Sequence, residues 1–567
     1  MRSRSLSLVA LVSLGIAATA CAVDLPADTD SSGTKNIGKS SSELEIIASP
    51  PTSLVPATGI ATPGFKPVDD AIRRLMSERC IGGAVIGISY GGAIVHNRGY
   101  GYKDGPPSST CATPEDPFVG GARIAPDTPF RVGSNSKAVL AAVFRREIKK
   151  ALSEKRGKPA TNWDVEQLKL LDNGELTLVS PKVKEAMLAG GSDGCAVANP
   201  WTKVTLGQLL RHRSGLPRSY ESPYLHLSAL RGLDGANKLA AQEQASGAPL
   251  SAKTALKDVR GTNAYFVPRA TLEETVAAQG GRCFAFEPGQ SKLYSNAGYG
   301  VLNYVLEHVT GRPFVAPNGY PTFHALSSLS SFTDDELGFA SGIERSHTAL
   351  GARDPAEPQY RHWSTTQSTY YYTVKDDKRA WCLLGPTGCD FAKFRLEDSR
   401  FNWKWEQQRV GFTYETNSES PGAGALAAEA PKYLAFMHRF TVSPPYGMDR
   451  TLVDSDLTYE HTGAYNGTRS WVLQAGGTPI KYLVLGTKPD GTWSFDANNA
   501  RERSCALPKG VDVFFAMNQS ADARCGADQD CSVCEDDECE TKKSAYSRYV
   551  HILKEALCKV SWSFGPQ

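Results

Sequence analysis

The order of strand and helix patterns along the chain constrains its fold more than any other feature. A strand pattern comes early, as a hairpin at 82–102 with its turn at Gly91-Gly92. Helical spacing of apolar residues dominates the middle, and strand patterns return at 459–488 before a last amphipathic helix. The order predicts an α/β protein of the α+β sandwich type. One antiparallel sheet is built from both chain ends and flanked by helices, with a mostly helical subdomain between them.

The same patterns place the individual elements. The two late strands, 469–474 and 481–486, are expected to form a hairpin through a turn at 476–478, because two glycines lie between them. Helices are predicted at 68–80, from near Ser134 onward, at 202–217, after Asn296 with its end at Gly311 and Pro313, after a turn within 420–440, and at 544–560.

The N-terminus has the pattern of an export signal. Residues 1–20 combine Arg2 and Arg4 with a short apolar run and small residues, which is typical of a signal peptide. Cys21 follows directly, as in bacterial lipoproteins, where this cysteine is lipidated and attaches the protein to the membrane. Ala18 occupies the position where leucine is usual, so lipidation at Cys21 and plain secretion both stay open. In either case we expect an exported protein, in the cell envelope (periplasmic or outer-surface) or secreted.

Composition divides the rest of the chain. Residues 21–64 are rich in Ser, Thr, Pro, Asp and Gly, which is typical of a flexible tether. The remaining 65–567 are expected to form one domain with irregular insertions near 218–280 and 320–420. The net charge of +2 is too small to indicate binding to nucleic acid.

The cysteines agree with export. Setting Cys21 aside leaves 12 of the 13, an even number, which in an oxidising compartment predicts disulfides. A cysteine-rich region spans 505–558, and its cluster at 525–539 could imitate a zinc site. Exported thiols usually oxidise, so we interpret the cluster as a disulfide-bonded loop and predict no metal.

One short motif carries the chemistry. Ser134 and Lys137 are three residues apart at the start of a predicted helix, so they lie one turn apart on the same face. A serine hydroxyl needs a neighbouring base to act as a nucleophile, and burial can lower a lysine pKa enough for it to serve. The pair Ser32 and Lys35 has the same spacing, but a flexible tether cannot hold a nucleophile in place.

Four stretches together resemble a known family. In order they are "FRVGSNSK", "TLGQLLRHRSGLP", "LYSNAGYG" and "HTGAYNG", with a weaker fifth in "SPGAGALAAEAPKYLAFM". The chain resembles the serine β-lactamase and D,D-peptidase superfamily, in its class C-like branch, which includes esterases and D-amino-acid peptidases. The resemblance implies a β-lactamase/transpeptidase-like fold.

The resemblance also implies roles. Ser134 forms the acyl-enzyme, while Lys137 and Tyr294 handle protons. Asn296 holds Lys137 and a substrate amide, and it also suits a helix N-cap. The backbone N–H groups of Ser134 and Ala464 form an oxyanion hole.

The last motif departs from the family pattern. His461-Thr462-Gly463 stands where most β-lactamases have Lys-Thr-Gly. Gly463 is expected to let substrate lie along the strand, and a neutral His461 to act as a hydrogen-bond donor. The missing cation favours an esterase or peptidase over a dedicated β-lactamase. His212 and Arg213 are interpreted as surface or loop-anchoring residues without a catalytic role.

These features predict a serine hydrolase that needs no metal or organic cofactor. Its substrate is a small molecule or peptide: a small ester, a D-amino-acid peptide or a β-lactam. The alternative is a catalytically silent protein of the same fold that binds cell-wall peptides or a protein partner. The sequence does not indicate the oligomeric state.

Overall fold

The computed structural model describes residues within one compact unit, Ser49–Gln567. Residues 1–20, which are predicted to be a signal peptide, lie outside the described residues, as do Cys21, the cysteine cluster at 525–539 and most of both insertions. The described residues are 55–79, 81–103, 122–189, 197, 200–216, 264–268, 273, 276, 277, 280, 283–311, 371–375, 378–382, 424, 426–465, 468–484, 501–518 and 548–562.

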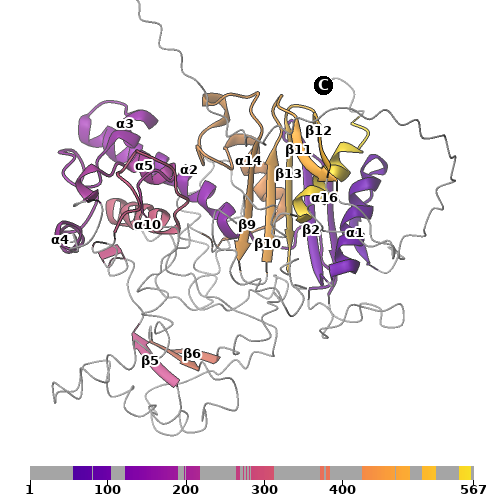
Figure 1. Ribbon diagram of the computed structural model, residues 1–567, viewed down its shortest axis with the longest axis horizontal. Coiled ribbons are helices and arrows are strands. Elements are labelled where there is room, and N and C mark those ends of the chain that lie inside the picture. The colour runs from indigo at the N-terminus through magenta and orange to yellow at the C-terminus, as the bar shows by residue number, and fades with distance from the viewer. Residues whose placement is uncertain are drawn as a thin grey trace, which may run out of the picture. The chain divides into compact units, whose positions relative to one another are not determined.

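A six-stranded antiparallel sheet contains strands from both ends of the chain (Figure 1). Its order is β1-β3-β2-β13-β10-β9, and the early and late strands meet where β2 pairs with β13, with Ile88 opposite Val513. The predicted sheet is therefore confirmed. Its strands are β1 (Ala57–Ile60), β2 (Gly83–Tyr90), β3 (Ala93–Gly101), β9 (Tyr459–Tyr465), β10 (Thr468–Gln474) and β13 (Val511–Met517).

Strand β1 lies within 21–64, the segment that the sequence analysis interprets as a tether. Its backbone pairs with β3, with Ala57 opposite Tyr100 and Ile60 opposite Asn97. Four residues are too few to show an alternating pattern, so only the pairing identifies the strand. The folded part therefore begins before residue 65.

The predicted late hairpin is wrong. Strand β11 (Ile480–Val484) pairs with β12 (Arg501–Cys505) in a separate two-stranded sheet and not with β10. The two glycines between β10 and β11 pass close to another segment: the Gly477 N–H donates to the Asp456 carbonyl at 2.8 Å, and a Cβ on Gly476 would lie 2.4 Å from the Leu457 carbonyl oxygen. They permit close packing of two chain segments rather than a two-strand turn.

Helices cover both faces of the sheet (Figure 1). Helix α14 (Ala430–Arg439) packs on one face, and α1 (Lys66–Arg79) and α16 (Arg548–Cys558) pack on the other. Along β13 the side chains alternate: Phe514 joins the core under α14, whereas its two neighbours join the core under α1 and α16. This alternation is the period-two pattern of a strand that is buried on both faces.

A second group of helices lies between the strand-forming ends of the sequence. The helix predicted at 202–217 is shorter than expected, because it begins at the capping box of Thr205 with Gln208 and ends before His212, which has a φ of +58°. The group comprises α2 (Ser136–Arg156), α3 (Asn162–Gln167), α4 (Pro181–Ala189), α5 (Leu206–Leu210) and α10 (Asn296–Thr310).

No helix of the described residues is long and apolar enough to cross a bilayer.

The two predicted insertions meet in a small sheet of their own. Strand β5 (Ala264–Pro268) comes from the first insertion, and β6 (Tyr371–Lys375) and β7 (Lys378–Cys382) come from the second. All pairs are antiparallel and the order is β5-β7-β6. Segments more than 100 residues apart in the sequence are thus joined by backbone hydrogen bonds.

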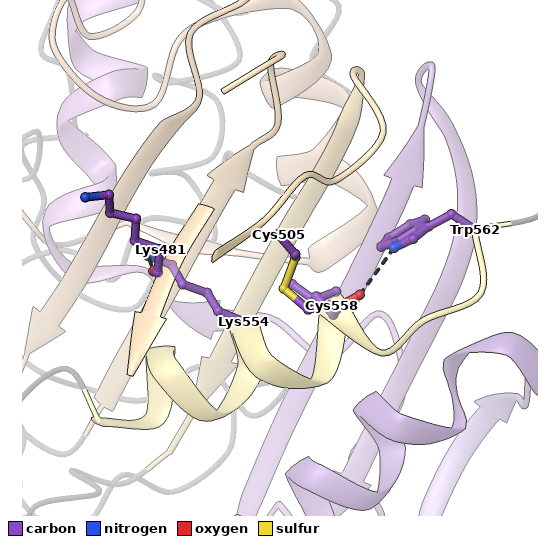
Figure 2. The surroundings of a disulfide bond; sticks show 6 residues. Lys481, Cys505, Lys554, Cys558 and Trp562 are labelled. Atoms are coloured by element: carbon purple, nitrogen blue, oxygen red, sulfur yellow. Dashed lines mark hydrogen bonds between the residues drawn. A yellow bond between two sulfur atoms is a disulfide. The ribbon is translucent and has the colours of Figure 1, made fainter. Parts of the chain in front are cut away.

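A disulfide fastens the C-terminal helix to the end of β12 (Figure 2). Cys505 and Cys558 have Cα atoms 5.9 Å apart and are separated by 53 residues. On either side of the bond, the Lys554 Nζ donates to the Lys481 carbonyl at 3.3 Å and the Trp562 Nε1–H donates to the Leu557 carbonyl at 3.2 Å. This pair confirms the prediction of disulfides for two of the twelve cysteines.

Replacing both Cys505 and Cys558 with serine is expected to lower the free energy of unfolding by about 2–4 kcal/mol, because the bond no longer restricts the unfolded chain. Chemical denaturation of the double variant beside the wild type measures the loss. The site described below is outside α16 and β12, so its activity per folded molecule is expected to stay unchanged. Equal unfolding midpoints and slopes for the two proteins would contradict the prediction.

Candidate active site

Ser134 lies in a short turn at the start of a long helix. It is the middle residue of the 3₁₀ turn η3 (Gly133–Asn135), which leads directly into α2. The turn follows the short strand β4 (Phe130–Arg131), which pairs with β8 (Ala427–Ala428). The hydroxyl is half-buried, and the nearby helix N-terminus favours negative charge that develops on it.

The buried amine of Lys137 contacts this hydroxyl. Its Nζ donates to the Ser134 Oγ at 3.2 Å, and the side chain has no exposed surface. The Nζ also lies 4.8 Å from the ring centroid of Tyr294 and 5.6 Å from that of Tyr299. The structure therefore brings the predicted pair, Ser134 and Lys137, into contact beside the rings of these two tyrosines.

Of the two tyrosines beside Lys137, Tyr294 is the one suited to proton transfer. The Tyr299 hydroxyl donates to the Leu210 carbonyl at 3.1 Å, and burial raises the Tyr299 pKa well above its usual value. Tyr299 is thus a structural phenol. Tyr294 is half-buried in the loop before α10, between the rings of His212 and His461, with centroids 4.5 and 6.2 Å away.

Asn296 is the first residue of α10, but it is not its cap. The cap is Ser295, whose Oγ accepts the Gly298 N–H at 3.0 Å. The predicted N-cap role of Asn296 is therefore wrong. The described contacts contain no hydrogen bond between Asn296 and Lys137, so the role of Asn296 stays a prediction.

A chain of hydrogen bonds orients His461. The Ser470 hydroxyl donates to the Val132 carbonyl at 2.7 Å, so its oxygen accepts the Asn135 Nδ2–H at 2.8 Å. This orientation turns the Asn135 Oδ1 towards His461, whose Nδ1 lies 3.0 Å away. Because Oδ1 can only accept, the proton of His461 is on Nδ1 and its Nε2 carries a lone pair.

His461 is neutral. Burial and the nearby positive charges of Lys137 and Lys292 lower its pKa to about 3. Its Nε2 has no hydrogen-bond partner among the described residues. The sequence predicted that His461 donates a hydrogen bond to substrate, whereas the bonding pattern leaves an acceptor there.

Close packing requires glycine at position 463, in addition to the predicted access for substrate. A Cβ at this position would lie 2.0 Å from the Val132 carbonyl oxygen and 2.3 Å from the Ser470 Oγ. Its neighbour Thr462 is paired in register with Trp471. Glycine thus lets β9 approach the loop that precedes Ser134.

Ala464 lies against the same loop. A Cβ built on Gly133, which has a φ of +52°, would lie 2.8 Å from the Ala464 backbone nitrogen. Since Gly133 directly precedes Ser134, the two backbone segments that should supply the oxyanion hole are adjacent. Strand β9 is the last strand in the sheet order, so its other edge is unpaired among the described strands.

His212 was missed by the sequence analysis as part of this site. Its side chain is 1% exposed, and it contacts the Tyr294 ring, so it is not a surface residue. Arg213 is exposed and donates to the Gly289 carbonyl, as expected of a loop anchor. The only sequence signal for His212 was its place within the motif "RHRSGLP".

The described residues were searched for groups that could bind a metal ion. Among the described residues, no group of three or more His, Cys, Asp or Glu could hold a metal ion. A buried amine against a hydroxyl, a phenol beside the amine, and two adjacent backbone segments are the features expected of a serine-nucleophile site.

Comparison with known proteins places the chain in a family. The family model described as Beta-lactamase matches residues 68–506. The chain therefore belongs to the beta-lactamase family, as the sequence motifs indicated. Family membership and the Ser134–Lys137 contact together support serine hydrolase activity.

Several solved structures are similar. One is the D-amino acid amidase from Ochrobactrum anthropi SV3, with 14% identity, a TM-score of 0.39, and coverage of 86% of this chain and 99% of that one. Another is EstCE1, a hydrolase with promiscuous acyltransferase activity, with 15% identity, a TM-score of 0.39, and coverage of 87% and 98%. A third is an octameric penicillin-binding protein homologue from Pyrococcus abyssi, with 15% identity, a TM-score of 0.36, and coverage of 80% and 73%. No curated protein matches the sequence. The family assignment rests on the family model alone.

Proposed function

We propose that this protein is an exported serine hydrolase that cleaves an ester or amide through an acyl-enzyme on Ser134. The Ser134 Oγ attacks the substrate carbonyl carbon while its proton passes to whichever of the Lys137 amine and the Tyr294 oxygen is unprotonated. The bond to the leaving group then breaks, and the leaving group takes that proton. Water, losing a proton to the same groups, attacks the acyl carbon and releases the acid and the free hydroxyl.

The observation that carries the proposal is the 3.2 Å contact between the Lys137 Nζ and the Ser134 Oγ. A binding protein of this fold would not need a fully buried lysine against a half-buried serine. The adjacent backbone of Gly133 and Ala464 supports the oxyanion hole implied by the family resemblance.

The arrangement around His461 favours a substrate without a carboxylate at this point of the site. The only N–H of the imidazole is engaged by Asn135, and the ring is neutral. A substrate carboxylate would meet the Nε2 lone pair, and two acceptors repel each other. A neutral ester, amide or hydroxyl-bearing group suits this position, which favours an esterase or D-amino-acid peptidase over a dedicated β-lactamase.

Export and the manner of attachment are part of the proposal. The signal pattern of residues 1–20 supports export, and Cys21 is the candidate for lipid attachment to the membrane. The disulfide between Cys505 and Cys558 is consistent with an oxidising compartment. The reaction is proposed to need no metal or organic cofactor.

A matched substrate panel tests the proposal. We expect the protein to hydrolyse a short-chain nitrophenyl ester, and to cleave a D-Ala-D-Ala peptide with a C-terminal methylamide at least about 10-fold faster, in kcat/KM, than the same peptide with a free carboxylate. The reason is that a buried carboxylate facing an acceptor loses its hydrogen bonds with water. A cephalosporin, which also carries a carboxylate, should be a poor substrate.

The outcomes separate the alternatives. A preference for the free carboxylate or the cephalosporin would contradict the assignment of His461 and point to the exposed Lys292 as an anion-binding group. A serine-directed fluorophosphonate probe should modify Ser134, as located by peptide mass spectrometry. Failure of this labelling, together with no turnover on the whole panel, would favour the silent binding protein.

A further inference from the structure

We propose that His212 is a positioning residue that holds Tyr294 at Lys137 by bonding to the backbone on both sides of it. The inference rests on the proposed function, because it gives Tyr294 a part in proton transfer. His212 itself is not placed in contact with the reacting atoms.

The backbone bonds bracket Tyr294. The N–H of Leu293, the residue before it, donates to the His212 carbonyl at 2.9 Å. The N–H of Ser295, the residue after it, donates to the His212 Nδ1 at 3.2 Å. Two bonds to one residue therefore set the position and direction of the peptide segment that carries the phenol.

The imidazole also packs directly on the phenol. Its centroid is 4.5 Å from that of Tyr294 and 5.1 Å from that of Tyr299, and these are the two rings that face the Lys137 amine. The ring of Tyr446 closes the third side, edge-on, at 5.5 Å. His212 thus packs against both tyrosine rings and limits the movement of Tyr294 away from Lys137.

The bonding requires one tautomer of His212. Because Nδ1 accepts the Ser295 N–H, it has no proton, and the neutral ring carries its proton on Nε2. Burial and the charge of Lys137 lower the His212 pKa well below its usual value, so the ring stays neutral at physiological pH. A protonated ring would lose the acceptor.

This histidine destabilises the fold in two ways. Its φ of +58° is the left-handed region, which a side chain other than glycine rarely adopts. Its buried Nε2–H finds no acceptor among the residues that the structure describes. Strain and an unsatisfied donor at one position beside a reactive group are typical of a residue kept for the site rather than for stability.

A series of variants of the full chain tests the proposal. His212→Gly keeps the backbone conformation and the carbonyl that binds Leu293, but removes the ring. We expect it to lower kcat on a nitrophenyl ester by about 10- to 100-fold with little change in KM, since misplacing a catalytic group slows chemistry more than binding. His212→Asn offers a side-chain oxygen to Ser295 and tolerates the positive φ, so it should recover most of the loss.

Asp172→Gly is the matched control. Asp172 also has a positive φ, +55°, but it lies in the loop between α3 and α4, with an exposed side chain paired to Lys184. The same backbone change there should leave kcat unchanged. The rate of fluorophosphonate labelling at Ser134 provides a second measurement that does not depend on the choice of substrate.

The outcomes are distinct. If the wild type is neither labelled nor active, the proposed function fails. If the wild type is labelled, but His212→Gly reacts at the same rate, or His212→Asn is as slow as His212→Gly, the positioning role is overturned.

Discussion

Replacing Ser134 with alanine is expected to lower kcat by about 10⁴- to 10⁶-fold, which is the loss seen when a nucleophile of a serine hydrolase is removed. The change deletes one half-buried hydroxyl at the start of α2, so the fold should be retained. Steady-state kinetics on the nitrophenyl ester and a thermal melt measure the two effects. Residual turnover would come from the oxyanion hole and from binding alone.

The control for this variant comes from the chain itself. Ser32 and Lys35 have the same spacing as Ser134 and Lys137, so Ser32→Ala removes a serine from a motif of equal sequence resemblance. It should retain full activity. If the Ser134→Ala protein kept more than a few per cent of wild-type kcat, the proposal of an acyl-enzyme on Ser134 would be wrong, whatever the stability of the variant.

Replacing Gly133 with alanine is expected to lower kcat by about 10²- to 10³-fold, the size of effect produced by losing one oxyanion donor. The new Cβ would lie 2.8 Å from the Ala464 nitrogen and 3.0 Å from its carbonyl carbon, so the two backbone segments must move apart. Ser134 and Lys137 remain, which means that covalent labelling should slow without disappearing.

Gly157→Ala separates the clash from backbone strain. Gly157 caps α2 with a φ of +65°, and nothing lies within 4 Å of a Cβ built there. Both substitutions put alanine in the left-handed region, at about 1–2 kcal/mol of stability each. We expect near-normal kcat for Gly157→Ala; equal losses of kcat in both variants would attribute the effect to stability and refute the oxyanion geometry.

Local patterns predicted the parts of the fold that local physics controls. The hairpin of β2 and β3 has its turn at Gly91-Gly92, where both residues have positive φ, and α10 ends at Gly311 in the left-handed conformation. Apolar periodicity placed both ends of α1, and the start of α2, to within two residues. In these elements the propensity of the residues and their tertiary surroundings favour the same structure.

The errors in the sheets have a common cause, which is that strand pairing is non-local. Nothing within 481–486 shows that β11 pairs with β12 rather than β10, and nothing within 57–60 shows that it extends the sheet. The helix expected at 202–217 was also too long, because its end depends on the backbone of His212, whose carbonyl accepts the N–H of Leu293 beside Tyr294.

Motif spacing and family resemblance, then, were enough to name Ser134, Lys137 and Tyr294 as candidates, since a turn of helix sets the first two side by side. The tertiary structure alone determined the protonation of His461 and the burial of His212. Asn135 and Ser470, 335 positions apart, determine which nitrogen of His461 carries the proton, and His212 becomes a buried neighbour of Tyr294. Protonation and hydrogen bonding depend on burial and on partners distant in sequence, and folding is what supplies both.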